Sequence, residues 1–153
     1  MIEQPLTRRD LRKFFDVKSA TPGDDRPLNN VLRALDIRLR GGTTRWPVIW
    51  AALGLSAQQD PQHFTALTAP LLTAQAVADL IGVQDPSIIY RWSKGQLPQG
   101  AALFPEKIDL SNGRKNARAR RWRQAEVLAW HCGDPHPQYV KPAPVFGALT
   151  PAK

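Results

Sequence analysis

Residues 6–17 read LTRRDLRKFFDV, and residues 72–83 read LTAQAVADLIGV. A Leu-Thr pair opens both stretches, and apolar residues follow at matching positions 66 residues apart. Their i, i+3, i+4 spacing predicts a short amphipathic helix in each stretch. Thr7 and Thr73 are the predicted N-caps, because a threonine hydroxyl can accept a hydrogen bond from an unpaired backbone N–H of the first turn. The match indicates an internal duplication.

Similar elements follow in each half. A second short helix is predicted at 27–35 and at 86–94, with proline at its start. A hairpin is predicted around Gly41-Gly42, with strands at 37–40 and 43–46, and a longer one, from 108 to 122, around Asn112-Gly113, since these pairs tolerate positive φ. Both hairpins end in Arg-Trp, at residues 45–46 and 121–122, and lead into a last helix at 47–53 or 123–130.

This order of elements predicts a mainly α fold with short β-hairpin wings, built from tandem winged helix-turn-helix modules. Residues 1–55 form the first, divergent module and 71–133 the second. Residues 56–70 read as a polar linker, and the proline-rich residues 134–153 as an extended tail. A unit of about 60 residues buries only about 60% of its surface alone, so the two are expected to pack on each other.

Charge and composition narrow the function. The net charge of +8 and the pI near 10.3 favour a polyanionic partner, and each predicted module carries a net +4. No apolar run reaches the roughly 20 residues of a membrane helix. The N-terminus lacks the features of a signal peptide, and the single cysteine excludes an internal disulfide. The expected location is the cytoplasm, with association to the nucleoid when the protein is bound to DNA.

The second half resembles a known family. Residues 72–83, IIYRWSKGQLP at 88–98 and the closing RWRQAEVLAW at 121–130 are similar to the AlpA/excisionase group of MerR-like winged helix proteins. The resemblance covers about 60 residues and implies DNA binding by a small regulator or recombination directionality factor of a phage or mobile element. The insert at 99–107 and the long wing are larger than expected for that family. The first half resembles the family only through the internal repeat.

A recognition helix and its wing supply the predicted DNA contacts of the second half. An α-helix fits the major groove, and arginine pairs with guanine or phosphate. Residues 114–123 hold six Lys/Arg and no acid. The predicted contacts are Ser87, Tyr90, Arg91 and Lys94 on the helix, and Asn112, Arg114, Lys115, Asn116, Arg118 and Arg120 on the wing. The structural alternative is a solvated basic face, and Arg121 and Arg123 are alternatively expected to cap or pair with helix residues.

The equivalent positions of the first half are weaker candidates, because its helix-to-helix link, 18–26, is long for a tight turn. They are Arg26, Asn29, Asn30 and Arg33 on the helix, and Arg38, Arg40, Thr43 and Thr44 on the wing. A dimer or partner surface is the alternative for this half.

Other residues favour structural roles. Trp46, Trp50, Trp122 and Trp130 are interpreted as core anchors rather than base-stacking platforms. His131, Cys132 and His136 do not have the spacing of a zinc site. No nucleophile–base set, glycine-rich phosphate loop or carboxylate pair is present, so neither an enzyme nor a cofactor is predicted.

The leading hypothesis is a sequence-specific double-stranded DNA-binding regulator whose two modules read two half-sites. One alternative is an excisionase that bends DNA for an integrase. Another is a packaging or partition adaptor with a protein partner. RNA binding is weaker, since no exposed aromatic motif is present. The expected partners are duplex DNA and an integrase, RNA polymerase or other protein, with a homodimer or cooperative array as the assembly.

Overall fold

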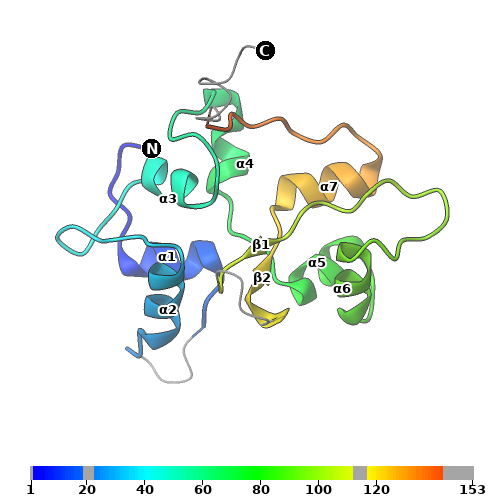
Figure 1. Cartoon of the computed structure of the whole chain (residues 1–153), viewed down its shortest axis with the longest axis horizontal. Helices are drawn as coiled ribbons and strands as arrows, with labels where there is room; N and C mark the ends of the chain where they lie inside the picture. The colour runs from blue at the N-terminus through cyan, green and yellow to red at the C-terminus, as the bar shows by residue number, and fades with distance from the viewer. Residues whose placement is uncertain (1, 19–22, 112–116, 143–153) are drawn as a thin grey trace, which may run out of the picture.

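The computed structural model describes residues 2–18, 23–111 and 117–142 (Figure 1). This part of the chain is mainly helical, with one two-stranded antiparallel sheet. None of its helices is long and apolar enough to cross a membrane. The elements are α1 (Arg8–Phe15), α2 (Arg26–Ala34), α3 (Trp46–Ala52), η1 (Pro61–His63), α4 (Phe64–Thr68), α5 (Ala74–Ile81), α6 (Ser87–Ser93), β1 (Ile108–Asp109), η2 (Ala117–Ala119), β2 (Arg120–Arg121) and α7 (Gln124–Cys132).

The sequence repeat extends to the backbone of α1 and α5. The hydroxyls of Thr7 and Thr73 each accept a hydrogen bond from the backbone N–H three residues later, as predicted. Both helices have eight residues. Each ends at a residue in the left-handed conformation, Asp16 with φ 52° and Gly82 with φ 82°. These pairs are also 66 residues apart, so the sequence repeat is a repeat of helix start, length and end.

The second helices, α2 and α6, also have matching ends. Each has a proline beside its first residue, and each is followed by a backbone bond spanning five residues, from Ile37 N to Leu32 O and from Gln96 N to Arg91 O. The offset between them is 59 rather than 66, because the link before α6 is shorter than the link before α2. The buried residues of the two helices do not correspond, so α2 and α6 present different faces to their surroundings.

A short antiparallel contact joins the start of each half to its closing helix. Leu6 pairs with Thr44, and Leu72 pairs with Trp122, through two backbone hydrogen bonds in each case. The next residues, Arg45 and Arg123, are the N-caps of α3 and α7. In the structure Arg45 is therefore equivalent to Arg123, whereas the sequence match pairs Arg45 with Arg121.

The two hairpins differ in extent. Gly41 and Gly42 both have positive φ and form the predicted tight turn, but the first hairpin has only the isolated bridge between Arg40 and Thr43 instead of the two predicted strands. In the second hairpin β1 pairs with β2, with Ile108 opposite Arg121. The predicted Asn112-Gly113 turn lies outside the described residues.

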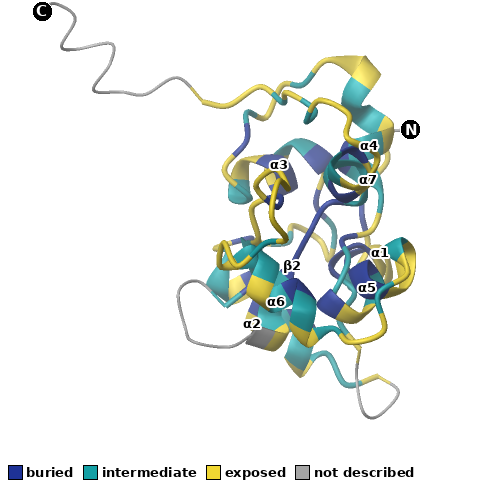
Figure 2. Ribbon diagram, turned by 90° about the vertical axis from the view of Figure 1, so that its right-hand side faces the viewer, coloured by how far each residue is buried: buried dark blue, intermediate teal, exposed yellow. Residues whose placement is uncertain are grey.

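Two hydrophobic clusters form the core, and the first crosses the predicted module boundary. It combines residues such as Phe15, Leu28 and Trp50 with Leu67, Leu71 and Leu110 from later in the chain. The second cluster centres on Val77, Ile89, Phe104, Trp122 and Val127. The hairpin of the second half thus packs on the first half, and Figure 2 shows buried residues through the middle of the molecule at β2.

Residues 56–70 are not a simple polar linker. They contain η1 and α4, and Leu67 is buried in the first cluster. The Trp50 indole donates to the Leu67 carbonyl (3.3 Å) and stacks on Phe64. The start of the predicted tail is also attached. Residues 134–142 contain no helix or strand, but Val140 exchanges hydrogen bonds with Gln59. Residues 143–153 of the predicted tail lie outside the described part.

Candidate nucleic-acid interface

Helix α6 packs on α5 and presents a polar face. Ser87, Arg91 and Lys94 are exposed at i, i+4 and i+7, so they lie along one side of the helix. Ile89 is fully buried on the opposite side. This arrangement places three of the predicted contacts on a single accessible face, which has the width that a major groove admits.

The base of the second hairpin lies beside α6. Tyr90 is half-buried, with its ring 6.2 Å from that of Trp122. The Arg120 guanidinium lies over the Tyr90 ring, 6.0 Å from its centroid. Tyr90 therefore joins helix and hairpin, and its ring is less accessible than predicted for a DNA contact. Arg118 is exposed on the same hairpin. The predicted wing contacts Asn112, Arg114, Lys115 and Asn116 lie outside the described residues.

An acidic residue at the start of α6 was missed by the sequence reasoning. The Asp85 carboxylate accepts a hydrogen bond from Ser87 N (2.9 Å), and this bond lowers the pKa of Asp85. A negative charge at this end disfavours phosphate there, whereas Arg91 and Lys94 favour it further along the helix. The Asp-Pro-Ser order before the helix was the signal that could have revealed this Asx turn.

Arg121 and Arg123 have structural roles, as the alternative interpretation anticipated. The Arg121 guanidinium donates to the Phe15 carbonyl (2.8 Å) and the Asp16 carbonyl (3.1 Å) at the C-terminal end of α1. It also donates to the Arg118 and Arg120 carbonyls, so it joins the hairpin of the second half to a helix of the first. Arg123 is buried 3.9 Å from Glu126.

The predicted contacts on α2 divide into two groups. Arg26 forms a bidentate pair with Asp24, which lowers the pKa of Asp24. The Asn29 side chain accepts a bond from Arg8 (2.6 Å), which fixes it against α1. Asn30 and Arg33 are exposed and line a groove next to the second hairpin, so they are the accessible pair.

The first hairpin exposes fewer of the predicted DNA-contact side chains than expected. Thr44 is buried where it pairs with Leu6, so its side chain does not reach the surface. The Thr43 hydroxyl donates to the Arg40 carbonyl (3.2 Å). Arg38 and Arg40 are exposed, with Arg38 3.8 Å from Asp36. In Figure 1 this hairpin extends to the left edge, away from β1 and β2.

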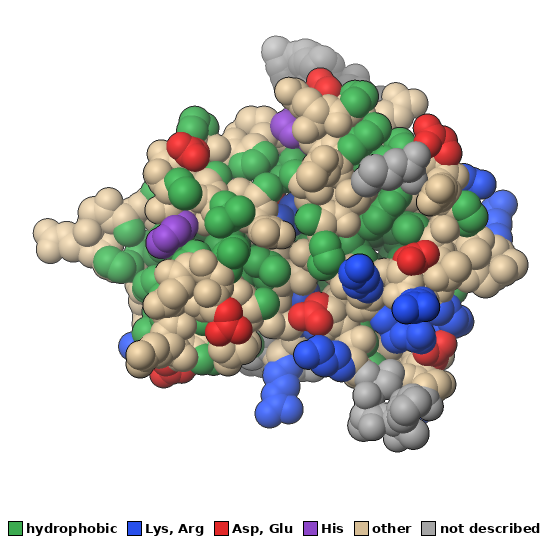
Figure 3. All heavy atoms as spheres, turned by 180° about the vertical axis from the view of Figure 1, so that it is seen from behind, with side chains coloured by type: hydrophobic (Ala, Val, Ile, Leu, Met, Phe, Trp, Pro, Cys, Tyr) green, Lys and Arg blue, Asp and Glu red, His purple; other side chains and the backbone are tan. Residues whose placement is uncertain are grey.

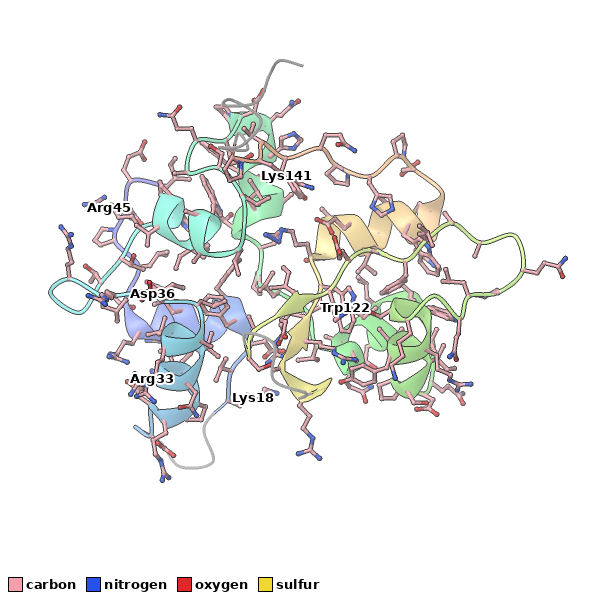
Figure 4. The ribbon with its side chains drawn as sticks, viewed as in Figure 1. Lys18, Arg33, Asp36, Arg45, Trp122 and Lys141 are labelled. Atoms are coloured by element: carbon pink, nitrogen blue, oxygen red, sulfur yellow. The ribbon has the colours of Figure 1, made fainter. Side chains whose placement is uncertain are left out.

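Charged side chains are unevenly spread over the surface. Figure 3 shows most of the Lys and Arg in view over the lower centre and the right of that face, with Asp and Glu among them. Figure 4 places Arg33 and Lys18 at the lower end and Lys141 at the opposite, upper end. The helices α2 and α6 flank the hairpin on this lower side (Figure 1).

The burial of the tryptophans is consistent with their predicted role as core anchors. Trp46, Trp50 and Trp122 are buried, and the partly buried Trp130 packs against the second cluster. Among the described residues, no three His, Cys, Asp or Glu side chains come together as a metal site.

A cavity of about 520 Å³ lies between the Leu53–Leu55 turn, residues 103–108 and the start of the tail. Arg123, Glu126 and Tyr139 line it. Burial raises the pKa of Glu126, and burial raises the pKa of Tyr139 to about 12. Both changes follow from lost solvation of the charged form.

Comparisons with models of protein families, with characterised proteins and with solved structures found no match to this chain.

Proposed function

We propose that this protein binds double-stranded DNA with α6 in the major groove and the β1–β2 hairpin against the adjacent backbone. In this proposal each half is a winged helix-turn-helix module, the first one divergent. The observation that carries the proposal is the exposed Ser87–Arg91–Lys94 face of α6, which lies beside a basic hairpin and on a helix anchored by Ile89. An exposed helix face with two cations beyond its first turn suits a groove lined by phosphates.

The charge distribution supports the same function. Several arginines near the N-terminal half of α2 are neutralised by carboxylates, whereas Arg91 and Lys94 form no ion pair with a carboxylate among the described residues. Like charges on one side of a protein repel each other, and a polyanion relieves that repulsion. The resemblance of the second half to the AlpA/excisionase group makes a sequence-specific regulator of a mobile element the proposed biological role.

Selection of bound sequences from random duplex DNA tests this function. The wild-type protein is compared with Arg91→Ala and Lys94→Ala, and with Lys141→Ala as a control that removes one cation at the opposite end of the molecule (Figure 4). The expected result is an enriched motif that weakens in both α6 variants and persists in the control. An affinity for duplex DNA that both α6 variants retain in full would refute the assignment of α6.

A further inference from the structure

The two halves form a groove that neither has alone. Its volume is about 540 Å³, and it lies between α2 and the second hairpin. Asn30, Arg33 and Pro27 line it from the first half, and Ser111, Leu110 and Arg118 line it from the second. The wall includes a third arginine, Arg121, at its base.

The chemistry of this groove favours an anion. Three of its lining residues are arginines, two more carry amide or hydroxyl groups, and none is acidic. Ser111 donates its backbone N–H and its hydroxyl to the Asp109 carboxylate, and Arg121 donates to four backbone carbonyls. The Arg33 and Arg118 guanidinium groups and the Asn30 amide are therefore the donors that suit phosphate oxygens.

The position of the groove relates it to the face of α6. Arg121 ties the hairpin to the C-terminal end of α1, and Arg120 lies over Tyr90 of α6. The hairpin therefore lies between α2 and α6 in one packed unit, as Figure 1 shows. The first hairpin, in contrast, extends away from β1 and β2 (Figure 1).

We propose that the groove between α2 and the β1–β2 hairpin binds backbone phosphates of the same DNA duplex that α6 contacts. The inference rests on the proposed function and changes one expectation from the sequence. Helix α2 then holds the DNA backbone next to the α6 site, instead of reading bases in a separate half-site. The chain presents one composite surface, and Asn30, Arg33 and Arg118 are its phosphate-binding residues.

The salt dependence of DNA affinity tests this assignment. Fluorescence anisotropy with a labelled duplex, measured over a range of salt concentrations, gives the slope of log affinity against log salt. Arg33→Ala and Arg118→Ala are each expected to reduce the magnitude of that slope by about 0.9, the value for one lost phosphate contact. Lys141→Ala is the matched control and is expected to change the slope less. Unfolding in urea verifies that each variant is folded.

Distinct results separate this inference from the proposed function. If Arg33→Ala behaves like Lys141→Ala while Arg91→Ala weakens binding, the groove assignment is wrong and the α6 assignment stands. If the wild-type protein does not bind duplex DNA, both are wrong. A free phosphate compound is the other source of the same chemistry. If ATP or inorganic phosphate binds the wild type and not Arg33→Ala, with no effect of Arg33→Ala on the DNA slope, DNA is not the occupant.

A chemical probe gives an independent measurement. Cys132 is exposed and is the single cysteine, so Cys132→Ser provides a background for new attachment sites. A DNA-cleaving chelate is attached at Arg26→Cys on α2 or at Gln96→Cys just beyond α6, both exposed positions outside the proposed contacts. One composite surface predicts cleavage from both positions within the same short duplex. Cleavage from position 96 alone would overturn the proposal.

Discussion

Replacing Arg121 tests whether the two halves depend on each other for stability. Its guanidinium makes two hydrogen bonds across the halves, to the carbonyls of Phe15 and Asp16, while the residue is only 7% exposed. A hydrogen bond that involves a charged group contributes about 1.5 kcal/mol or more. Loss of both bonds in Arg121→Ala is therefore expected to lower the free energy of unfolding by roughly 3 kcal/mol.

Urea unfolding followed by tryptophan fluorescence measures this loss. Trp50 reports on the first hydrophobic cluster and Trp122 on the second, so the signal covers both halves. With a slope of about 2 kcal/mol per molar urea, the midpoint should fall by roughly 1.5 M. Arg121→Lys keeps the charge but lacks the planar fork, so an intermediate loss is expected.

The control for this prediction is Arg38→Ala. The Arg38 side chain is 90% exposed and 3.8 Å from an exposed Asp36 carboxylate, and such surface pairs contribute about 0–1 kcal/mol. If Arg121→Ala loses no more stability than Arg38→Ala, the two guanidinium hydrogen bonds to Phe15 and Asp16 do not hold the halves together. One composite surface would then have no structural basis.

Three further properties can be tested: the left-handed helix ends at Gly82 and Asp16, the buried Tyr139 hydroxyl and the bending of bound DNA. Gly82→Ala should lower the melting temperature by about 2–4 °C, which corresponds to roughly 1 kcal/mol, because alanine at φ 82° is strained. Asp16→Gly at the equivalent position should leave the melting temperature unchanged or raise it. Equal losses in both variants by calorimetry would contradict this. The Tyr139 hydroxyl is buried with no hydrogen-bond partner among the described residues, so Tyr139→Phe should not destabilise the protein at pH 7. The pKa of Tyr139 in the folded protein, about 12, lies above its ordinary value of 10.0, so the unfolded chain releases this proton first. The stability of the wild type should therefore fall between pH 10 and 12 more than that of Tyr139→Phe. Parallel profiles of stability against pH would contradict the assignment. An excisionase role predicts a bend in bound DNA, which circularly permuted fragments reveal by gel mobility, and uniform mobility would favour the regulator.

Local features of the fold followed from the sequence. The helices at Thr7 and Thr73 and the Gly41-Gly42 turn depend on residues a few positions apart, through capping bonds and φ preferences. These short-range effects act in the same way wherever the segment lies in the molecule. The exposed face of α6 was predictable for the same reason, because helical periodicity alone separates Arg91 and Lys94 from Ile89.

Features that join distant segments were decided only by the tertiary structure. The Arg-Trp repeat suggested an equivalence that strand pairing overturned, because Trp122 rather than Arg120 lies opposite Leu72 at the start of its half. Leu67, in a stretch that reads as polar, is buried because Trp50 and Phe64 pack around it. The α2 groove likewise combines residues separated by more than 70 positions. Burial and long-range hydrogen bonds depend on which surfaces meet, and no local pattern in the chain encodes that choice.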